Sequence, residues 1–146
     1  MAQTNTYKRA KKQAQPQIDT SLGHLPPQSV EVEKRVLGAL MIDVDAFTVV
    51  SELLRPETFY DPKHQKIFHA IQQLNIMEVP VDFVSVIEQL KKEGTHDEVG
   101  APTYIIELTD SVASSANIEY HARVLAQKYV ARQLISYAST IEGKAF

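Results

Sequence analysis

Residues 117–142 constrain the fold most, because these twenty-six consecutive residues contain neither proline nor glycine. A continuous helix over them would be about 39 Å long at about 1.5 Å per residue. Ile118, Leu125 and Tyr129 share one face of this helix, and a second apolar stripe lies roughly 120° away. We call this second stripe the distal stripe, and it consists of Val130, Leu134, Tyr137 and Ile141. Its spacing of four, three and four is typical of paired helices, so we expect the first half of the helix to pack on the preceding domain and the second half to meet another polypeptide.

Composition favours one globular domain that acts without a metal–thiolate site or a membrane anchor. The chain has 146 residues, 44% of them hydrophobic, and no cysteine, which excludes disulfides and is compatible with a reducing cytoplasm. No apolar run reaches the roughly 18 residues of a membrane span. Residues 1–20 carry four basic and one acidic side chain, so the net charge of −3 leaves −6 for the rest of the chain. An acidic body is poorly suited to holding a nucleic-acid backbone by itself.

Start and stop signals divide residues 26–112 into five short helices. Ser29 is a good N-cap for a helix over 30–41, with Glu31 and Glu33 in the first turn, where the helix dipole favours acidic groups. Further N-caps are expected at Asp43, at Asp61 before a proline, and at Asp82, while Gly94 and Pro102 suit the end of the fourth helix and the start of the fifth. Helical spacing predicts that the inward-facing residues are Val32, Val36, Leu37, Leu40, Met41, Phe47, Val50, Leu53, Leu54, Ile67, Phe68, Ile71, Leu74, Phe83, Val86, Ile87, Leu90, Tyr104, Ile105 and Leu108.

The sequence therefore predicts an all-α fold with three parts. Residues 1–25 are expected to be a disordered basic tail, because they are rich in Gln, Lys, Thr and Pro. Residues 26–112 are expected to form a compact helical head, and residues 113–146 a long helix.

Motifs for catalysis, cofactors or metals are missing from the sequence. None of the five histidines forms an HExxH motif or an i, i+4 pair, and none of the five glycines belongs to a phosphate-binding loop. His64 is expected to cap or pack at the start of the third helix. This chain is therefore not expected to be an enzyme or to bind a cofactor or metal on its own.

Five segments carry a recognisable pattern: PPQSVEVEKRVLGALMID at 26–43, FYDPKHQKIFHAI at 59–71, VPVDFVS at 79–85, GAPTYIIEL at 100–108 and ANIEYHAR at 116–123. In order and in register, they resemble the amino-terminal domain of DnaB-type bacterial replicative DNA helicases over about residues 26–142. Two loop positions depart from the family pattern: Ala101 replaces a usual second glycine, and Ala113 a frequent proline.

The resemblance implies a role in DNA replication. Family members carry a second, RecA-like motor domain that binds ATP and Mg²⁺, contacts DNA and translocates on it; no Walker loop occurs here, so the chain resembles a fragment of such a cytoplasmic bacterial protein. In the family, the amino-terminal domain is a helical head plus a helical hairpin. Hairpins pair between subunits, three dimers form a collar on the hexameric ring, primase docks on this collar, and helicase loaders act on it in some bacteria. Residues 113–146 would be the first arm of the hairpin, with the turn near Gly143.

Seven residues are candidates for contacts with a second subunit or with primase. One side of the final helix is expected to meet a neighbouring subunit and the other side primase, and Tyr104 is a further candidate for the partner surface. Packing of Tyr104 inside the head, and burial of Leu134 and Ile135 inside their own hairpin, remain alternatives. The seven candidates are Tyr104, Val130, Leu134, Ile135, Tyr137, Ala138 and Ile141.

Two other functions compete with this interpretation. The first is a stand-alone helical DNA-binding module that uses the basic tail, which would bind DNA with a steep salt dependence. The second is a small helical enzyme, which would need a pocket of convergent polar groups.

Overall fold

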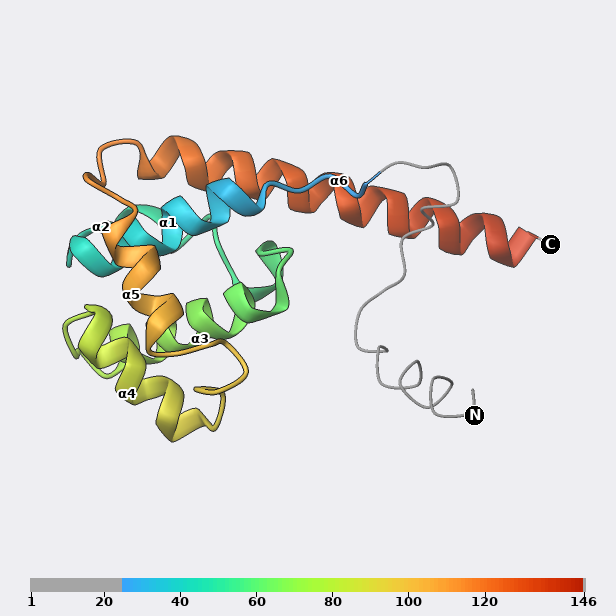
Figure 1. Ribbon diagram of the computed structural model, residues 1–146. Coiled ribbons are helices and arrows are strands. Elements are labelled where there is room, and N and C mark those ends of the chain that lie inside the picture. Colours follow the sequence, from blue (N-terminus) through green and yellow to red (C-terminus); the bar gives the residue numbers. More distant parts are fainter. Residues whose placement is uncertain (1–24, 146) are drawn as a thin grey trace, which may run out of the picture. The chain divides into compact units, whose positions relative to one another are not determined.

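All the regular elements between residues 25 and 145, the part of the chain that the computed structural model describes, are helices (Figure 1). The predicted all-α fold is confirmed. The predicted basic tail lies, except for residue 25, outside the described residues. The elements are α1 (Val30–Ile42), α2 (Ala46–Val50), the 3₁₀ helix η3 (Pro56–Thr58), α3 (Pro62–Ile76), α4 (Phe83–Glu93), α5 (Thr103–Asp110) and α6 (Ile118–Ala145).

The chain divides into two units. The larger unit spans Pro27–Ala131 and therefore contains α1 to α5 and the first half of α6. The smaller unit combines Met1–Pro26 with Arg132–Phe146, and its described part is residues 25–26 and 132–145.

Side-chain caps define three helix starts at predicted positions. The prediction of Asp43 as the N-cap of the second helix was wrong, because Asp43 follows the last residue of α1 and α2 begins only after Asp45. Ser29 accepts a hydrogen bond from the Val32 N–H at the start of α1, and Asp61 accepts one from the Lys63 N–H at the start of α3. At the start of α4, the Asp82 carboxylate accepts a hydrogen bond from the Ser85 N–H, and the Ser85 hydroxyl oxygen accepts one from the Asp82 N–H. Gly94 ends α4 in the left-handed conformation, with φ of 76°, which a residue without Cβ adopts most easily.

The core of the larger unit is built from the apolar faces of α1, α3, α4 and α5. In this core α1 packs against α3 and α5, and α3 packs against α4. Ile118, Ala122 and Leu125 of α6 are also buried in it, as expected for the first half of the final helix. Most predicted inward residues are buried, and Val32, Phe47, Leu53, Ile87 and Tyr104 are partly buried against the core.

The prediction for Phe83 was wrong, because its side chain is 41% exposed. Phe83 is the first residue of α4, and helical side chains tilt toward the amino terminus of their helix. Its ring therefore leaves the face that Val86 and Leu90 bury.

Two helix ends also differ from the predicted ones. The second helix ends at Val50 rather than continuing through Leu53 and Leu54, whose N–H groups both bond to the Val50 carbonyl in a turn. At the other end of the chain, α6 continues through Gly143 to Ala145, so the turn expected near Gly143 does not occur within the described residues. A glycine inside a helix costs only about 1 kcal/mol relative to alanine, which helical neighbours can offset.

Asp43 links the end of α1 to the segment that precedes α6. Its carboxylate accepts a hydrogen bond from the Ser115 hydroxyl at 2.6 Å and another from the Asp45 N–H at 2.9 Å. These two hydrogen bonds, the one from Ser115 first, lower the pKa of Asp43.

Gly38 allows α1 and α5 to approach closely, which yields a first prediction. A Cβ at this position would lie 2.6 Å from Val112 Cγ2 and would also overlap the Leu108 carbonyl. Because backbone cannot move aside cheaply, we expect Gly38→Ala to lower the free energy of unfolding by roughly 1–3 kcal/mol, measured by urea denaturation. Gly143→Ala is the matched control, since nothing lies within 4 Å of its Cβ position, and it should leave stability unchanged or raise it. A Gly38→Ala variant as stable as the parent would contradict this account of the α1–α5 contact.

Candidate functional site

The distal stripe is exposed along its whole length. Val130, Leu134, Tyr137 and Ile141 are 52%, 62%, 62% and 69% exposed, respectively, and they lie on one side of a continuous helix. Monomeric soluble proteins expose single apolar residues routinely, but rarely a contiguous row of large ones. The stripe is therefore a candidate surface for another polypeptide.

Ile135 and Ala138 lie beside the distal stripe on the same helix. Ala138 is exposed, and Ile135 is 37% exposed. At about 100° per residue, Ile135 lies on a different side of α6 from Leu134. Six of the seven candidate residues thus belong to α6, on two of its sides, while Tyr104 belongs to α5 in the larger unit.

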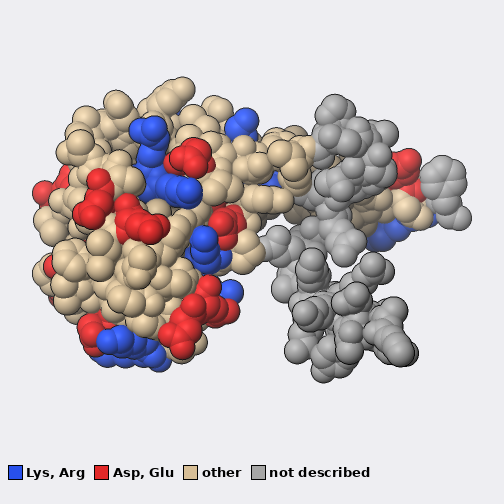
Figure 2. Space-filling view, viewed as in Figure 1, with Lys and Arg blue, Asp and Glu red and all other residues tan. Residues whose placement is uncertain are grey.

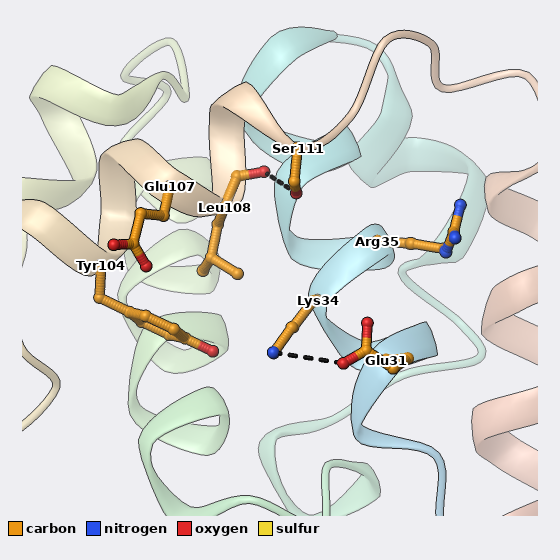
Figure 3. A pocket seen from close by; sticks show the side chains of 7 residues that line it. All are labelled: Glu31, Lys34, Arg35, Tyr104, Glu107, Leu108 and Ser111. Carbon is orange, nitrogen blue, oxygen red and sulfur yellow. Dashed lines mark hydrogen bonds and ion pairs between the residues drawn. The ribbon is translucent and has the colours of Figure 1, made fainter.

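Tyr104 lines a pocket of about 250 Å³ between the first turns of α1 and one face of α5 (Figure 3). Figure 3 shows the Tyr104 hydroxyl and the Lys34 amino group pointing toward one another across this pocket, while Lys34 forms an ion pair with Glu31 at 3.3 Å. The Lys63 amino group lies 4.1 Å from the centre of the tyrosine ring, a cation–π contact. The pocket is lined by Glu31, Lys34, Arg35, Tyr104, Glu107, Leu108 and Ser111.

A hydrogen-bonded chain runs inward from Tyr104. Its hydroxyl lies 2.6 Å from Nε2 of His64, and Nδ1 of the same ring lies 2.8 Å from Oε1 of Glu33. His64 and Glu33 are both fully buried. The Glu33 carboxylate also accepts the Tyr60 N–H at 2.6 Å and the Asp61 N–H at 3.3 Å, at the start of α3. This chain therefore joins α1, α3 and α5 at one point.

The surroundings keep the Tyr104 hydroxyl protonated. Burial, followed by the carboxylates of Asp61, Glu107, Glu33 and Glu31, raises its pKa to about 12. A phenol with this pKa is not a nucleophile at neutral pH, so the pocket is suited to binding rather than to bond-making.

Metal-binding clusters and membrane-spanning helices are absent from the described residues. Between residues 25 and 145, no group of three or more His, Asp or Glu side chains is arranged to hold a metal ion. No helix in this part of the chain is long and apolar enough to span a membrane. On the face of the larger unit in Figure 2, acidic and basic side chains are interspersed rather than gathered by sign, unlike a surface that holds a nucleic-acid backbone.

A sequence profile described as the DnaB-like helicase N terminal domain matches residues 25–127. The chain belongs to this family. The prediction drawn from the five segments is therefore confirmed at the level of the family.

Individual relatives of this DnaB-like domain agree with the family match. The replicative DNA helicase DnaB of Rhodothermus marinus is 44% identical over 124 residues, which are 85% of this chain and 13% of that protein. The replicative DNA helicase DnaB of Geobacillus stearothermophilus is 44% identical over 117 residues, which are 80% of this chain and 26% of that protein. The chain thus spans about a quarter or less of the length of these relatives.

The fold agrees with that of a solved DnaB domain. The crystal structure of the N-terminal domain of DnaB helicase from Mycobacterium tuberculosis superposes with a TM-score of 0.79 at 34% identity, covering 82% of this chain and 85% of that one. The family match ends at residue 127, before the distal stripe begins. The interface roles of the six α6 candidates therefore stay predictions.

Sequence reasoning missed Glu33 and His64 as partners. Glu33 was interpreted as a helix-dipole residue of the first turn, but it is buried, accepts hydrogen bonds from two backbone N–H groups and is hydrogen-bonded to His64. The burial of both residues could have been predicted from the sequence. Each is followed, three and four positions later, by two buried apolar residues of its own helix, and residues with this spacing share one helix face. Helical spacing alone thus places a carboxylate and an imidazole on buried faces.

The role of Glu33 yields a second prediction. In Glu33→Gln, the amide group replaces one acceptor oxygen with a donor, so at least one of the N–H groups that face it loses its partner. We expect the free energy of unfolding, measured by urea denaturation, to fall by roughly 1–3 kcal/mol. Glu31→Gln is the matched control, because its side chain is 78% exposed and its ion pair should contribute at most about 0.5 kcal/mol. Equal effects of the two substitutions would be inconsistent with a structural role for Glu33.

Proposed function

We propose that this chain is the collar and interaction domain of a bacterial replicative DNA helicase. In this role, α6 binds a second subunit through the distal stripe, and the domain provides a docking site for primase. The observation that carries the proposal is the row of four exposed apolar side chains on α6 of a DnaB-like domain. The unwinding of DNA with ATP and Mg²⁺ is proposed for the whole protein, since this chain corresponds to a small part of its relatives' length.

The energy available from the distal stripe supports association of moderate strength. Burying four large apolar side chains contributes roughly 6–12 kcal/mol, at about 1.5–3 kcal/mol each. Association costs an estimated 4–15 kcal/mol in lost translational and rotational freedom. The free energy gained by burying the stripe is therefore about equal to the free-energy cost of association. We propose that the stripe acts together with its flanking residues and with contacts elsewhere in the assembled ring.

Primase docking is proposed for two further surfaces. Ile135 lies about 100° from Leu134 around α6, on the side proposed for primase, and Ala138 lies between Ile135 and the distal stripe. The pocket beside Tyr104 combines a buried leucine floor with an aromatic ring and charges of both signs, a composition common at protein interfaces. Loader proteins, where they exist, would act on the same assembly.

Self-association through the distal stripe yields a third prediction. Replacing Leu134 and Ile141 by Asp together should weaken self-association by on the order of a hundredfold or more, because each substitution removes about 1.5–3 kcal/mol of apolar burial. Sedimentation velocity over a range of concentrations measures the change, and far-UV circular dichroism should report unchanged helicity.

A double variant with the same added charge controls this experiment. Ser136 and Ser139 lie on α6 away from the distal stripe, since neither is three or four positions from one of its residues, so Ser136→Asp with Ser139→Asp should leave association near the parent value. Unchanged assembly of the Leu134 and Ile141 variant would rule out the distal stripe as the subunit contact.

Primase docking yields a fourth prediction. Ile135→Asp should weaken binding of the helicase-binding domain of primase by at least about tenfold, since it removes roughly 1.5–3 kcal/mol of apolar contact, and should spare self-association. Isothermal titration calorimetry measures the affinity, with Thr140→Asp as the control on another side of the helix. An affinity that is the same for both variants and the parent would refute docking on this side of α6.

A further inference from the structure

The buried chain of Glu33, His64 and Tyr104 has a property that neither subunit pairing nor docking uses. The imidazole of His64 is fully buried, and both of its nitrogens are hydrogen-bonded: Nδ1 to Glu33 at 2.8 Å and Nε2 to the Tyr104 hydroxyl at 2.6 Å. Neutral histidine carries one proton on its ring nitrogens, so one nitrogen must donate and the other must accept. The direction of both hydrogen bonds is therefore fixed by the position of a single proton.

The surroundings of Glu33 select that position. Its carboxylate oxygens receive the Tyr60 and Asp61 N–H groups at the amino-terminal end of α3, where the helix dipole favours a negative charge. An ionised carboxylate only accepts hydrogen bonds, so Nδ1 of His64 must carry the proton and donate it to Glu33. Nε2 is then the bare nitrogen, and it accepts the hydrogen bond from the Tyr104 hydroxyl.

This arrangement determines what Tyr104 offers to the pocket. While its own proton is held by His64, the hydroxyl can only accept hydrogen bonds from groups in the pocket. The carboxylates of Asp61, Glu107, Glu33 and Glu31 act on the same hydroxyl and favour a donor or a cation beside it. The Lys34 amino group, which points toward the hydroxyl, is a cationic hydrogen-bond donor of this kind (Figure 3).

We propose that His64 is a proton-operated switch that reverses the hydrogen-bonding polarity of the Tyr104 hydroxyl in the pocket. When His64 takes up a second proton, Nε2 becomes a donor, and the Tyr104 oxygen must accept from it. The protons balance as follows: a hydronium ion in the pocket gives a proton to the Tyr104 oxygen and becomes water, while the tyrosine's own proton passes to Nε2 of His64. The hydroxyl then donates outward, to an acceptor such as a carboxylate or carbonyl group.

Titratable and charged groups from three helices surround the switch. They are Glu31, Glu33, Lys34 and Arg35 of α1, Asp61 and Lys63 at the start of α3, and Glu107 of α5 beside Tyr104. His64 is hydrogen-bonded directly to the Tyr104 hydroxyl, so a midpoint shared by the His64 and Tyr104 signals identifies His64 as the titrating group.

Nuclear magnetic resonance of this chain tests the switch without any binding partner, so its outcome is independent of the proposed docking function. Long-range proton–nitrogen spectra should reveal the tautomer of His64, with a protonated Nδ1 and a bare Nε2 at high pH. On acidification, Nε2 should become protonated, and the Tyr104 Cζ resonance should shift with the same midpoint. His64→Gln should abolish this shift of Tyr104, whereas His69→Gln, which removes an exposed histidine of the same helix, should leave it intact.

Three results would each overturn the proposal. The first is a neutral His64 ring protonated on Nε2. The second is a Tyr104 Cζ resonance that does not shift with the His64 midpoint, or that still shifts on acidification in His64→Gln. The third is a His64 ring that stays neutral down to the pH at which the chain unfolds. The tautomer and midpoint are read from the parent chain, so they decide the question even if His64→Gln does not fold.

Discussion

The change of apolar face halfway along α6 is the constraint on which the rest of this account depends. The first half of the helix contributes Ile118, Ala122 and Leu125 to the core of the larger unit. A rigid helix cannot also bury a stripe roughly 120° away against the same surface. The distal stripe therefore stays exposed among the described residues, and the least costly way to remove it from water is another helix with a matching stripe.

Much of the head could be predicted because its signals are local. Caps at Ser29, Asp61, Asp82 and Gly94 act within a few residues of the chain, and the structure places helix ends at each of them. The errors come where tertiary packing decides. Phe83 has the spacing of a core residue, but its position at the very start of α4 takes its ring out of the core.

The candidate site could be predicted only in part, for a physical reason. An exposed apolar stripe is a property of one helix, so helical spacing alone indicates the distal stripe. The buried chain joins residues 31 and 40 positions apart in the sequence, and no local pattern pairs Glu33 with His64 or His64 with Tyr104. Spacing could place the first two on buried faces, but only the packing of α1, α3 and α5 brings them together. Tyr104 consequently has two roles, as a partner of His64 inside and as a pocket residue outside.

Cysteine labelling tests most directly whether the distal stripe is buried on self-association. The chain has no cysteine, so Leu134→Cys and Ser139→Cys each introduce a single thiol, one on the stripe and one on the opposite side of α6. The rate of maleimide labelling is followed as protein concentration rises through the association range found by sedimentation. The account predicts that labelling at position 134 slows as the chain associates, while labelling at position 139 does not. Equal rates at both positions in an associated sample, or a chain that remains monomeric at every concentration, would contradict it.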